Sequence, residues 1–441
     1  MINLENIALE SSFLEYDINE PIKIYTGHFT IEVADDFFEI LGEVKIAFLP
    51  KARLIFEGAI SGNLSKLFEF EKAMKSNNMM INVPGFMKSE VLISGITDGS
   101  KGNKVSGILK RSILTSAETK VNRMEFTVVN FVNDLGRRIV HGRFKFSGRT
   151  KLKYKDWEII LDKRYDYSNK KIFDRLKNSG GYLITHVGYL KRVDDKLFDT
   201  KEVEPLISGL YWLLSFSAGR HVAIPTLEGY HNEEVIWSKY QVPLIDGWTN
   251  NITWFPKQKS PSLEHLFPKV IEKQEDPFWN KVLWEVLSWY SQAHSSSIVE
   301  NKVVSVQVAL ETLAWVYLIV DRKSNISKSK YKYMNAAEKF REILSRFSID
   351  LSIPKLFIDI KDNYDDGPHL FTVFRNKIVH PTRELDFDNP IDKLHVLYLG
   401  VWYLELLTLG ILGYEGSYVN RLKVPIIEGV YEFVPWKTRD N

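Results

Sequence analysis

The sequence predicts an α+β protein of several domains, with a β-rich region in its first half and a helical bundle in its second half. Three observations support this fold class. Short alternating runs of apolar and polar residues fill the chain up to about residue 160. Apolar residues recur at helical spacing from residue 277 onward. The length of 441 residues exceeds that of one ordinary domain.

The N-terminal region, residues 1–245, begins with strand-like runs separated by turn residues. Several of them are rich in valine, isoleucine and phenylalanine, which favour strands. Many short strands at this spacing are typical of a sandwich or a barrel. The predicted strands cover residues 22–25, 29–33, 44–49, 52–58, 90–95, 107–109, 123–131, 138–146 and 157–161.

A mixed α/β segment follows, and the N-terminal region is either one unit or split near residue 165. Its helical pattern ends at glycines, and its strand-like runs are strongly apolar. The pattern predicts helices over residues 170–178 and 202–218, and strands over 182–190, 221–224 and 234–242.

The C-terminal half is predicted to be all-helical. Residues 246–276 contain three prolines and no sustained periodicity, which indicates a linker or covering loop. The bundle then covers residues 277–441. The predicted helices are 277–291, 303–321, 336–347, 370–379 and 391–412, with a polar, basic loop over 321–335.

Composition excludes several classes of site. The chain has no cysteine, so it has no disulfide, zinc ribbon or thiolate nucleophile, and this fits a reducing compartment. The first residues lack the pattern of a secretory signal, so we expect a cytoplasmic protein. The net charge is only +2, so a nucleic-acid partner would have to bind a local basic patch.

The apolar run of residues 394–414 is long enough to cross a bilayer. Glu405 lies at its centre, however, where a charged residue costs about 2.5–3.5 kcal/mol on membrane insertion. We therefore expect a buried central helix or a dimer-interface helix rather than a membrane span.

One short stretch carries a catalytic pattern. Arg375 and His380 are separated by four residues at the predicted end of a helix, Asn376 follows the arginine, and Pro381 follows the histidine. An arginine can hold an anionic phosphate and a histidine can transfer a proton, so the pair suits RNA cleavage without a metal. Chance supplies about one such spacing in a chain of this length, so the context has to support it.

The context adds a carboxylate and several lysines. Gln307 and Glu311 lie one turn apart on the same face of the most apolar helix. A buried carboxylate needs a partner, so Glu311 either takes part in catalysis or forms a structural ion pair with an arginine such as Arg375. The best candidates for holding an RNA backbone are four lysines, Lys328, Lys330, Lys332 and Lys377.

Two other stretches are weaker candidates. Basic residues alternate with aromatic ones over residues 137–155, which suits phosphate contacts, although one solvated face of a strand explains them as well. Asp359, Asp362, Asp365 and Asp366 match no metal-ligand spacing, so a metal-dependent hydrolase is a poor alternative and a solvated loop is expected.

Residues 277–441 resemble a HEPN domain, the helical bundle of many prokaryotic defence and toxin ribonucleases. The resemblance rests on Ala309-Leu310-Glu311, on the stretch 375–381 and on the apolar tail 404–414. A β-rich region ahead of such a domain is similar to ApeA-type abortive-infection proteins.

This resemblance implies a metal-independent endoribonuclease in anti-phage defence, acting without a cofactor. It implies that His380 is the general acid/base, Arg375 holds the scissile phosphate and Asn376 orients, with Glu311 beside them. It also implies a homodimer, an RNA substrate (with tRNA among the candidates), no membrane, and a phage-derived or small-molecule trigger at the N-terminal region. The alternative is a non-catalytic HEPN module for dimerisation and RNA binding.

Overall fold

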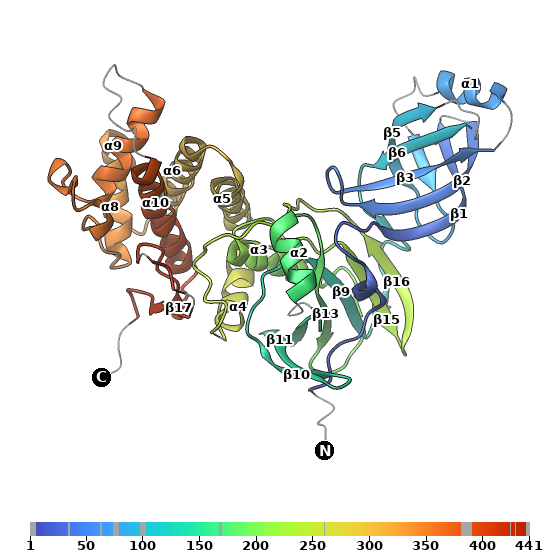
Figure 1. The fold of residues 1–441 in the computed structure, drawn as a ribbon, viewed down its shortest axis with the longest axis horizontal. Helices are drawn as coiled ribbons and strands as arrows, with labels where there is room; N and C mark the ends of the chain where they lie inside the picture. The colour runs from blue at the N-terminus through green and yellow to red at the C-terminus, as the bar shows by residue number, and fades with distance from the viewer. Residues whose placement is uncertain are drawn as a thin grey trace. The chain divides into compact units, whose positions relative to one another are not determined.

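The computed structural model describes residues 6–33, 36–61, 64–73, 79–97, 103–166, 170–259, 261–380, 390–423, 425–427 and 429–437. It is a mixed α+β protein, with a β-rich N-terminal region and helices in the C-terminal half, as predicted (Figure 1). The chain divides into two compact units. The first contains Met1–Asn133, Arg137–Ile207 and Val222–Trp248, and the second contains Asp134–Gly136, Ser208–His221 and Thr249–Asn441.

A six-stranded antiparallel barrel opens the first unit, which confirms the prediction of a sandwich or barrel. The barrel closes in the order β1-β2-β3-β6-β5-β4, and alternate side chains fill its interior. The two runs predicted at 22–25 and 29–33 are parts of one long strand. The elements are β1 (Ile22–Val33), β2 (Asp36–Ala47), β3 (Arg53–Ile60), α1 (Leu64–Ala73), β4 (Met79–Asn82), β5 (Ser89–Thr97) and β6 (Lys104–Leu109).

A row of glycines lets the first three barrel strands approach closely. Gly27 pairs with Gly42, and Gly42 pairs with Gly58, so the three lie side by side across β1, β2 and β3. A Cβ atom on Gly42 would lie 2.1 Å from the carbonyl oxygen of Glu57. Only glycine fits there, and such positions allow a sheet to curve into a barrel.

An eight-stranded antiparallel sheet completes the first unit, in the order β10-β11-β12-β13-β9-β15-β16-β7 (Figure 1). Its main strands are β9 (Arg123–Val129), β10 (Arg137–His141), β11 (Phe144–Tyr154), β12 (Trp157–Lys163), β13 (Ile184–Arg192), β15 (Thr226–His231) and β16 (Glu234–Tyr240), with β7 (Ile113–Leu114) at one edge. The short strands β8 (Lys120–Val121) and β14 (Phe198–Asp199) pair with each other.

The structure corrects two strand predictions in this sheet. The run 138–146 is a hairpin, because Gly142 adopts a positive φ of 55° and turns the chain between β10 and β11. Residues 221–224 are not a strand, since only Ala223 makes a bridge, to Val129, and the strand β15 begins at Thr226 instead. The helices α2 (Lys170–Ser179) and α3 (Glu204–Ala218) lie where they were predicted.

The second unit contains the C-terminal helices, ordered α4 to α10 along the chain (Figure 1). Helix α6 packs against α5, α8, α9 and α10, as expected for the most apolar helix. The elements are α4 (Ser262–Gln274), α5 (Pro277–Ser295), α6 (Val299–Trp315) with a π-helical continuation (Val316–Val320), α7 (Lys328–Tyr333), α8 (Ala336–Arg346), α9 (Gly367–Val379) and α10 (Pro390–Ile411), followed by β17 (Ser417–Tyr418) and β18 (Glu432–Phe433).

Two segments predicted to be loops are helical. Helix α4 lies within the stretch 246–276 that was predicted to be a linker, and it buries an apolar face that includes Leu263, Phe267 and Ile271. Pro268 lies inside this helix and obscured its periodicity. Helix α7 interrupts the predicted loop 321–335, because the Ser327 hydroxyl caps its N-terminus by accepting from the Lys330 amide.

Two helical segments, Val299–Val320 and Lys393–Ile411, are long and apolar enough to cross a membrane by length and composition alone. More than half of each apolar window is buried inside the fold, and core helices of soluble proteins pass the same test. Glu405, in the second segment, is buried but fully paired. Its carboxylate accepts hydrogen bonds from the Arg421 guanidinium, the Tyr290 hydroxyl and the Trp254 amide, at 2.5, 2.6 and 3.1 Å.

A glycine sets the distance between α9 and α10. A Cβ atom on Gly400 would lie 2.2 Å from the ring of Phe371, which is fully buried on α9. We expect Gly400→Ala to destabilise the second unit by about 1–3 kcal/mol, because the methyl group overpacks this contact. Thermal unfolding measures the loss. Gly247→Ala is the control, since its Cβ would meet no atom closer than 4.0 Å, and unchanged stability in Gly400→Ala would contradict the close packing.

Candidate functional site

Helix α9 carries the predicted catalytic residues and is fixed at its N-terminus. The Asp366 carboxylate caps the helix by accepting from the His369 amide at 2.8 Å. The same carboxylate pairs with the guanidinium of Arg341 on α8, with the shortest contact at 2.5 Å. Leu370, Phe371 and Phe374 then bury one face of the helix. The site at the other end therefore rests on a well-anchored helix.

Arg375 lies next to that buried face and is itself half-buried. Its Nη1 donates to the side-chain oxygen of the neighbouring Asn376 at 3.3 Å, a long hydrogen bond. Its Nε is buried and has no hydrogen-bond partner. Leaving a buried polar donor unpaired costs about 1–3 kcal/mol. Among the described residues no carboxylate is ion-paired with this guanidinium. Its fork remains available for an anion.

His380 ends the helix, as predicted. Its amide donates to the Asn376 carbonyl at 2.8 Å, while its own backbone leaves the helical region at φ −123° and ψ 73°. The imidazole is exposed, as is the side chain of Asn376. The role predicted for Pro381 lies outside the described residues.

The structure places Arg375 and His380 on the same helix end but gives no contact between their side chains within the described part of the chain. Five residues along a helix correspond to a rotation of about 140°, because each residue turns the helix by about 100°. The histidine leaves the helix at its last turn, so its final direction depends on the backbone there. A single chain presents two separate groups.

Glu311 differs from the sequence-based expectation. It accepts a hydrogen bond from the Gln307 side-chain amide at 2.6 Å, one turn earlier on α6. Among the described residues no arginine is ion-paired with it, in contrast to the predicted pair. Gln307 is 1% exposed, and its carbonyl oxygen has no hydrogen-bond partner. The sequence correctly placed both residues on one helix face but could not show that they hydrogen-bond to each other.

The predicted RNA-binding lysines are mostly solvent-exposed. Lys328, Lys330 and Lys332 belong to α7, and all three side chains are exposed. The ammonium group of Lys328 lies 5.7 Å from the centre of the Trp315 ring, a distance that allows a cation–π interaction. Lys377 lies on α9 and is half-buried. Helix α7 thus presents three positive charges on one short segment.

Some residues of the two weaker candidates have structural roles. In the basic stretch 137–155, Arg149 is buried and forms a bidentate pair with Asp162, and Lys153 faces Glu158. In the acidic run, Asp366 is the α9 cap. No group of three or more histidine, aspartate or glutamate side chains within the described parts of the chain is arranged to hold a metal ion.

Comparison with known proteins identifies two matching regions. Residues 276–432 match the family model described as the YopA C-terminal domain. Residues 116–251 match the family model described as the YopA central domain. The first region begins just before α5 and contains the stretch 375–380. The second region contains seven of the eight strands of the large sheet, all but β7. No solved structure matches the chain.

Proposed function

We propose that this protein is a metal-independent endoribonuclease of the HEPN type, in which Arg375 and His380 carry the chemistry. One observation supports this proposal above the others. The arginine on α9 is half-buried, with its Nε unpaired, and an exposed histidine ends the same helix. A structural arginine at this depth would ordinarily be paired with a carboxylate.

The reaction would use the ribose 2′-hydroxyl as an internal nucleophile. His380 accepts its proton while the oxygen attacks the adjacent phosphorus, and the bond to the 5′-oxygen of the next nucleotide breaks. That leaving oxygen takes up a proton from an imidazolium, so the products end in a 2′,3′-cyclic phosphate and a 5′-hydroxyl. Arg375 offsets the charge that develops on the phosphate oxygens, and Asn376 hydrogen-bonds its guanidinium.

Two copies of the chain would complete this site. One copy of this helix end offers the single imidazole of His380, whereas cleavage needs a base for the 2′-hydroxyl and an acid for the leaving oxygen. A homodimer that brings two such helix ends together supplies both. Glu311, on α6, would then either help to position the catalytic groups or only accept the hydrogen bond from Gln307.

The test is cleavage of an RNA oligonucleotide in EDTA. Wild type is expected to cut the RNA, to leave the 2′-deoxy version of the same sequence intact, and to produce the cyclic phosphate end. His380→Ala, purified in the same way, is expected not to cut. Cleavage of the 2′-deoxy strand, or equal cleavage by the variant, would contradict the proposal.

The lysines of α7 give a separate prediction about binding. Replacing Lys328, Lys330 and Lys332 with alanine is expected to weaken the binding of single-stranded RNA. The slope of log affinity against log salt should fall by about 2, because each lost phosphate contact contributes about 0.7. A titration at several salt concentrations measures the slope. The control is Lys281→Ala, which removes an exposed lysine from α5 and should leave the affinity and the slope nearly unchanged. Equal slopes for wild type and the triple variant would show that α7 is not part of the RNA-binding site.

The second candidate function is a non-catalytic HEPN module that dimerises and binds RNA. The long, weak contact between Arg375 and Asn376 is compatible with either role. Binding of RNA without cleavage by wild type favours this alternative. In both cases we propose a cytoplasmic protein that acts in anti-phage defence without membrane insertion and responds to a trigger at the N-terminal region.

A further inference from the structure

A pocket of about 600 Å³ lies on one face of the eight-stranded sheet, beneath the N-terminal segment. Its volume is in the range of small-molecule sites. All its walls belong to the first unit. The lining residues are Glu10, Ser11, Ser12, Leu14 and Glu15 from the segment, and Glu125, His141, Tyr165, Glu228 and Tyr230 from the sheet domain.

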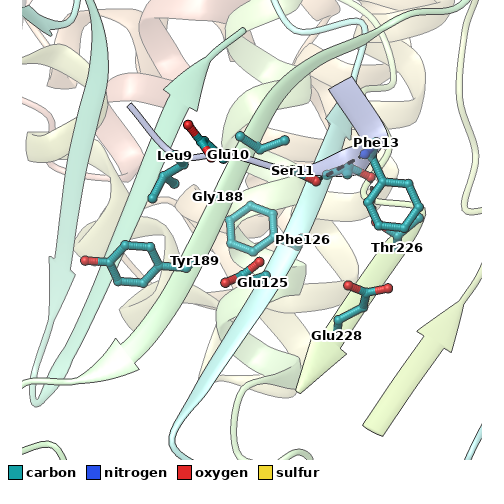
Figure 2. A pocket seen from close by; sticks show the side chains of 12 residues that line it. Leu9, Glu10, Ser11, Phe13, Glu125, Phe126, Gly188, Tyr189, Thr226 and Glu228 are labelled. Carbon is teal, nitrogen blue, oxygen red and sulfur yellow. Dashed lines mark hydrogen bonds between the residues drawn. The ribbon is translucent and has the colours of Figure 1, made fainter. Parts of the chain in front are cut away.

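The floor of the pocket is set by strand register. Glu125 on β9 pairs directly with Glu228 on β15, so both carboxylates project from the same face, as the close-up of the smaller adjoining cavity that they also line shows (Figure 2). Tyr189 on β13 is the opposite neighbour of Glu125 and lines a smaller adjoining cavity. Two like charges directly opposite each other destabilise a sheet. The pairing therefore brings two carboxyl groups together at the floor of the pocket, where a bound cation would relieve their repulsion.

The roof is held in place by hydrogen bonds to a buried ion pair and to Arg164. Arg149 and Asp162, which form an ion pair and are at most 6% exposed, also bind the backbone of this segment. The Arg149 guanidinium donates to the Ile7 carbonyl at 2.6 Å, and the Leu9 amide donates to the Asp162 carboxylate at 2.8 Å. Arg164 donates to the Leu14 carbonyl at 2.8 Å. The segment that carries Glu10 across the sheet is thereby fixed (Figure 2).

Three of the four carboxylates that line the pocket have no basic partner among the described residues. Glu125 is paired with Arg123, whose guanidinium also binds Glu233 and stacks on Tyr230 at 4.4 Å. Among the described residues no basic side chain is ion-paired with Glu10, Glu15 or Glu228. Glu228 accepts from the hydroxyls of Tyr240 and Tyr230, at 3.2 and 3.4 Å. Burial raises the pKa of the Glu228 carboxyl, which the two tyrosine hydroxyls oppose in part.

We propose that this pocket binds a small organic polycation, a compound with two or more ammonium groups separated by an alkyl chain. Carboxylates stand on both roof and floor, so one ammonium can reach each. The stacked rings of His141 and Tyr165, with centroids 4.2 Å apart, offer a face for the cation and the chain, whereas the ring of Tyr230 already lies against the Arg123 guanidinium. The carboxylates are too dispersed to share one metal ion, because no metal-binding group of three is found among the described residues.

The proposal does not depend on nuclease activity, and direct binding tests it. The experiment is calorimetry of the full-length protein with spermidine as the probe, in about 150 mM NaCl so that loose surface attraction is screened. We expect one saturable site with a dissociation constant below about 1 mM. Glu228→Gln on the floor and Glu10→Gln on the roof should each weaken binding about tenfold or more, since each removes a charge-assisted hydrogen bond.

The control is Glu272→Gln, which removes the same charge from an exposed position on α4 and should bind spermidine as wild type does. Circular dichroism checks the fold of each variant. If Glu228→Gln is misfolded, Glu10→Gln alone tests the site, because Glu10 is exposed and its replacement should leave the fold intact. The proposal is overturned if spermidine shows no saturable binding, if the pocket variants bind like Glu272→Gln, or if an equal concentration of Mg²⁺ displaces spermidine completely.

Discussion

Glu405→Gln is expected to destabilise the second unit by about 3–5 kcal/mol, because it leaves the Arg421 guanidinium as an unpaired charge in the core. Glu405 is 1% exposed and Arg421 is 3% exposed. The arginine makes two contacts to the carboxylate, at 2.5 and 3.1 Å, and it also donates to the Ile252 carbonyl at 2.8 Å. Glutamine keeps the size of the side chain but turns an amide group toward the arginine.

Thermal unfolding measures this effect, and a fall in the melting temperature on the order of 10 °C is expected for a unit of this size. The matched control is Glu300→Gln. Glu300 pairs with Lys393 at 2.7 Å, but both side chains are about one-third exposed, so its loss should change stability by less than about 1 kcal/mol. Equal stability of the two variants would contradict the assignment of Glu405 as a buried, fully paired charge.

The same residue shows what a sequence can predict about a buried charge. A glutamate at the centre of an apolar run argued against a membrane span, and this inference uses general energetics. The partner itself, Arg421, lies after the end of α10. Nothing local selects it from the other arginines of the chain. The interaction depends on how the C-terminal segment folds back, which no periodicity encodes.

Local signals explain which elements were predicted. Alternation at period 2 located most of the strands, and helical spacing located α5, α6, α8, α9 and α10 with small errors at their ends. The failures have physical causes. Pro268 lies within α4 and interrupted its pattern, and the turn at Gly142 lies inside what looked like one alternating run.

The candidate sites divide in the same way. Arg375 and His380 are close in sequence, so a helix end could be predicted from local residues alone. The Gln307–Glu311 hydrogen bond is local too. The sequence nevertheless favoured an arginine as the partner of Glu311, because it could not show which groups pack against that face of the helix. The pocket on the sheet was missed entirely, because Glu125 and Glu228 become neighbours only through the pairing of β9 with β15.

The second large effect is expected in RNA cleavage. His380→Ala should lower the rate by about 10²–10⁴-fold, the range that general acid–base catalysis contributes. Arg375→Ala should lower it by about 10²–10³-fold, because it removes a charge aimed at the phosphate in the transition state. Initial rates on the same oligonucleotide in EDTA, at saturating RNA, measure both effects as changes in kcat.

Arg375→Lys separates a specific role from a general one. A lysine keeps the positive charge but lacks the planar fork, so it should leave the rate close to that of Arg375→Ala if the guanidinium holds the phosphate through two hydrogen bonds. A wild-type rate in Arg375→Lys would show that Arg375 contributes only its positive charge. Arg346→Ala is the matched control. Arg346 lies on α8 and forms an ion pair with Glu342, one turn earlier on the same helix, so this variant should cut RNA as wild type does. If both Arg375→Ala and His380→Ala keep the wild-type rate, the helix end is not an active site. The unpaired Nε of Arg375 would then need another partner, either an RNA phosphate that is bound but not cleaved or a group from a second copy of the chain.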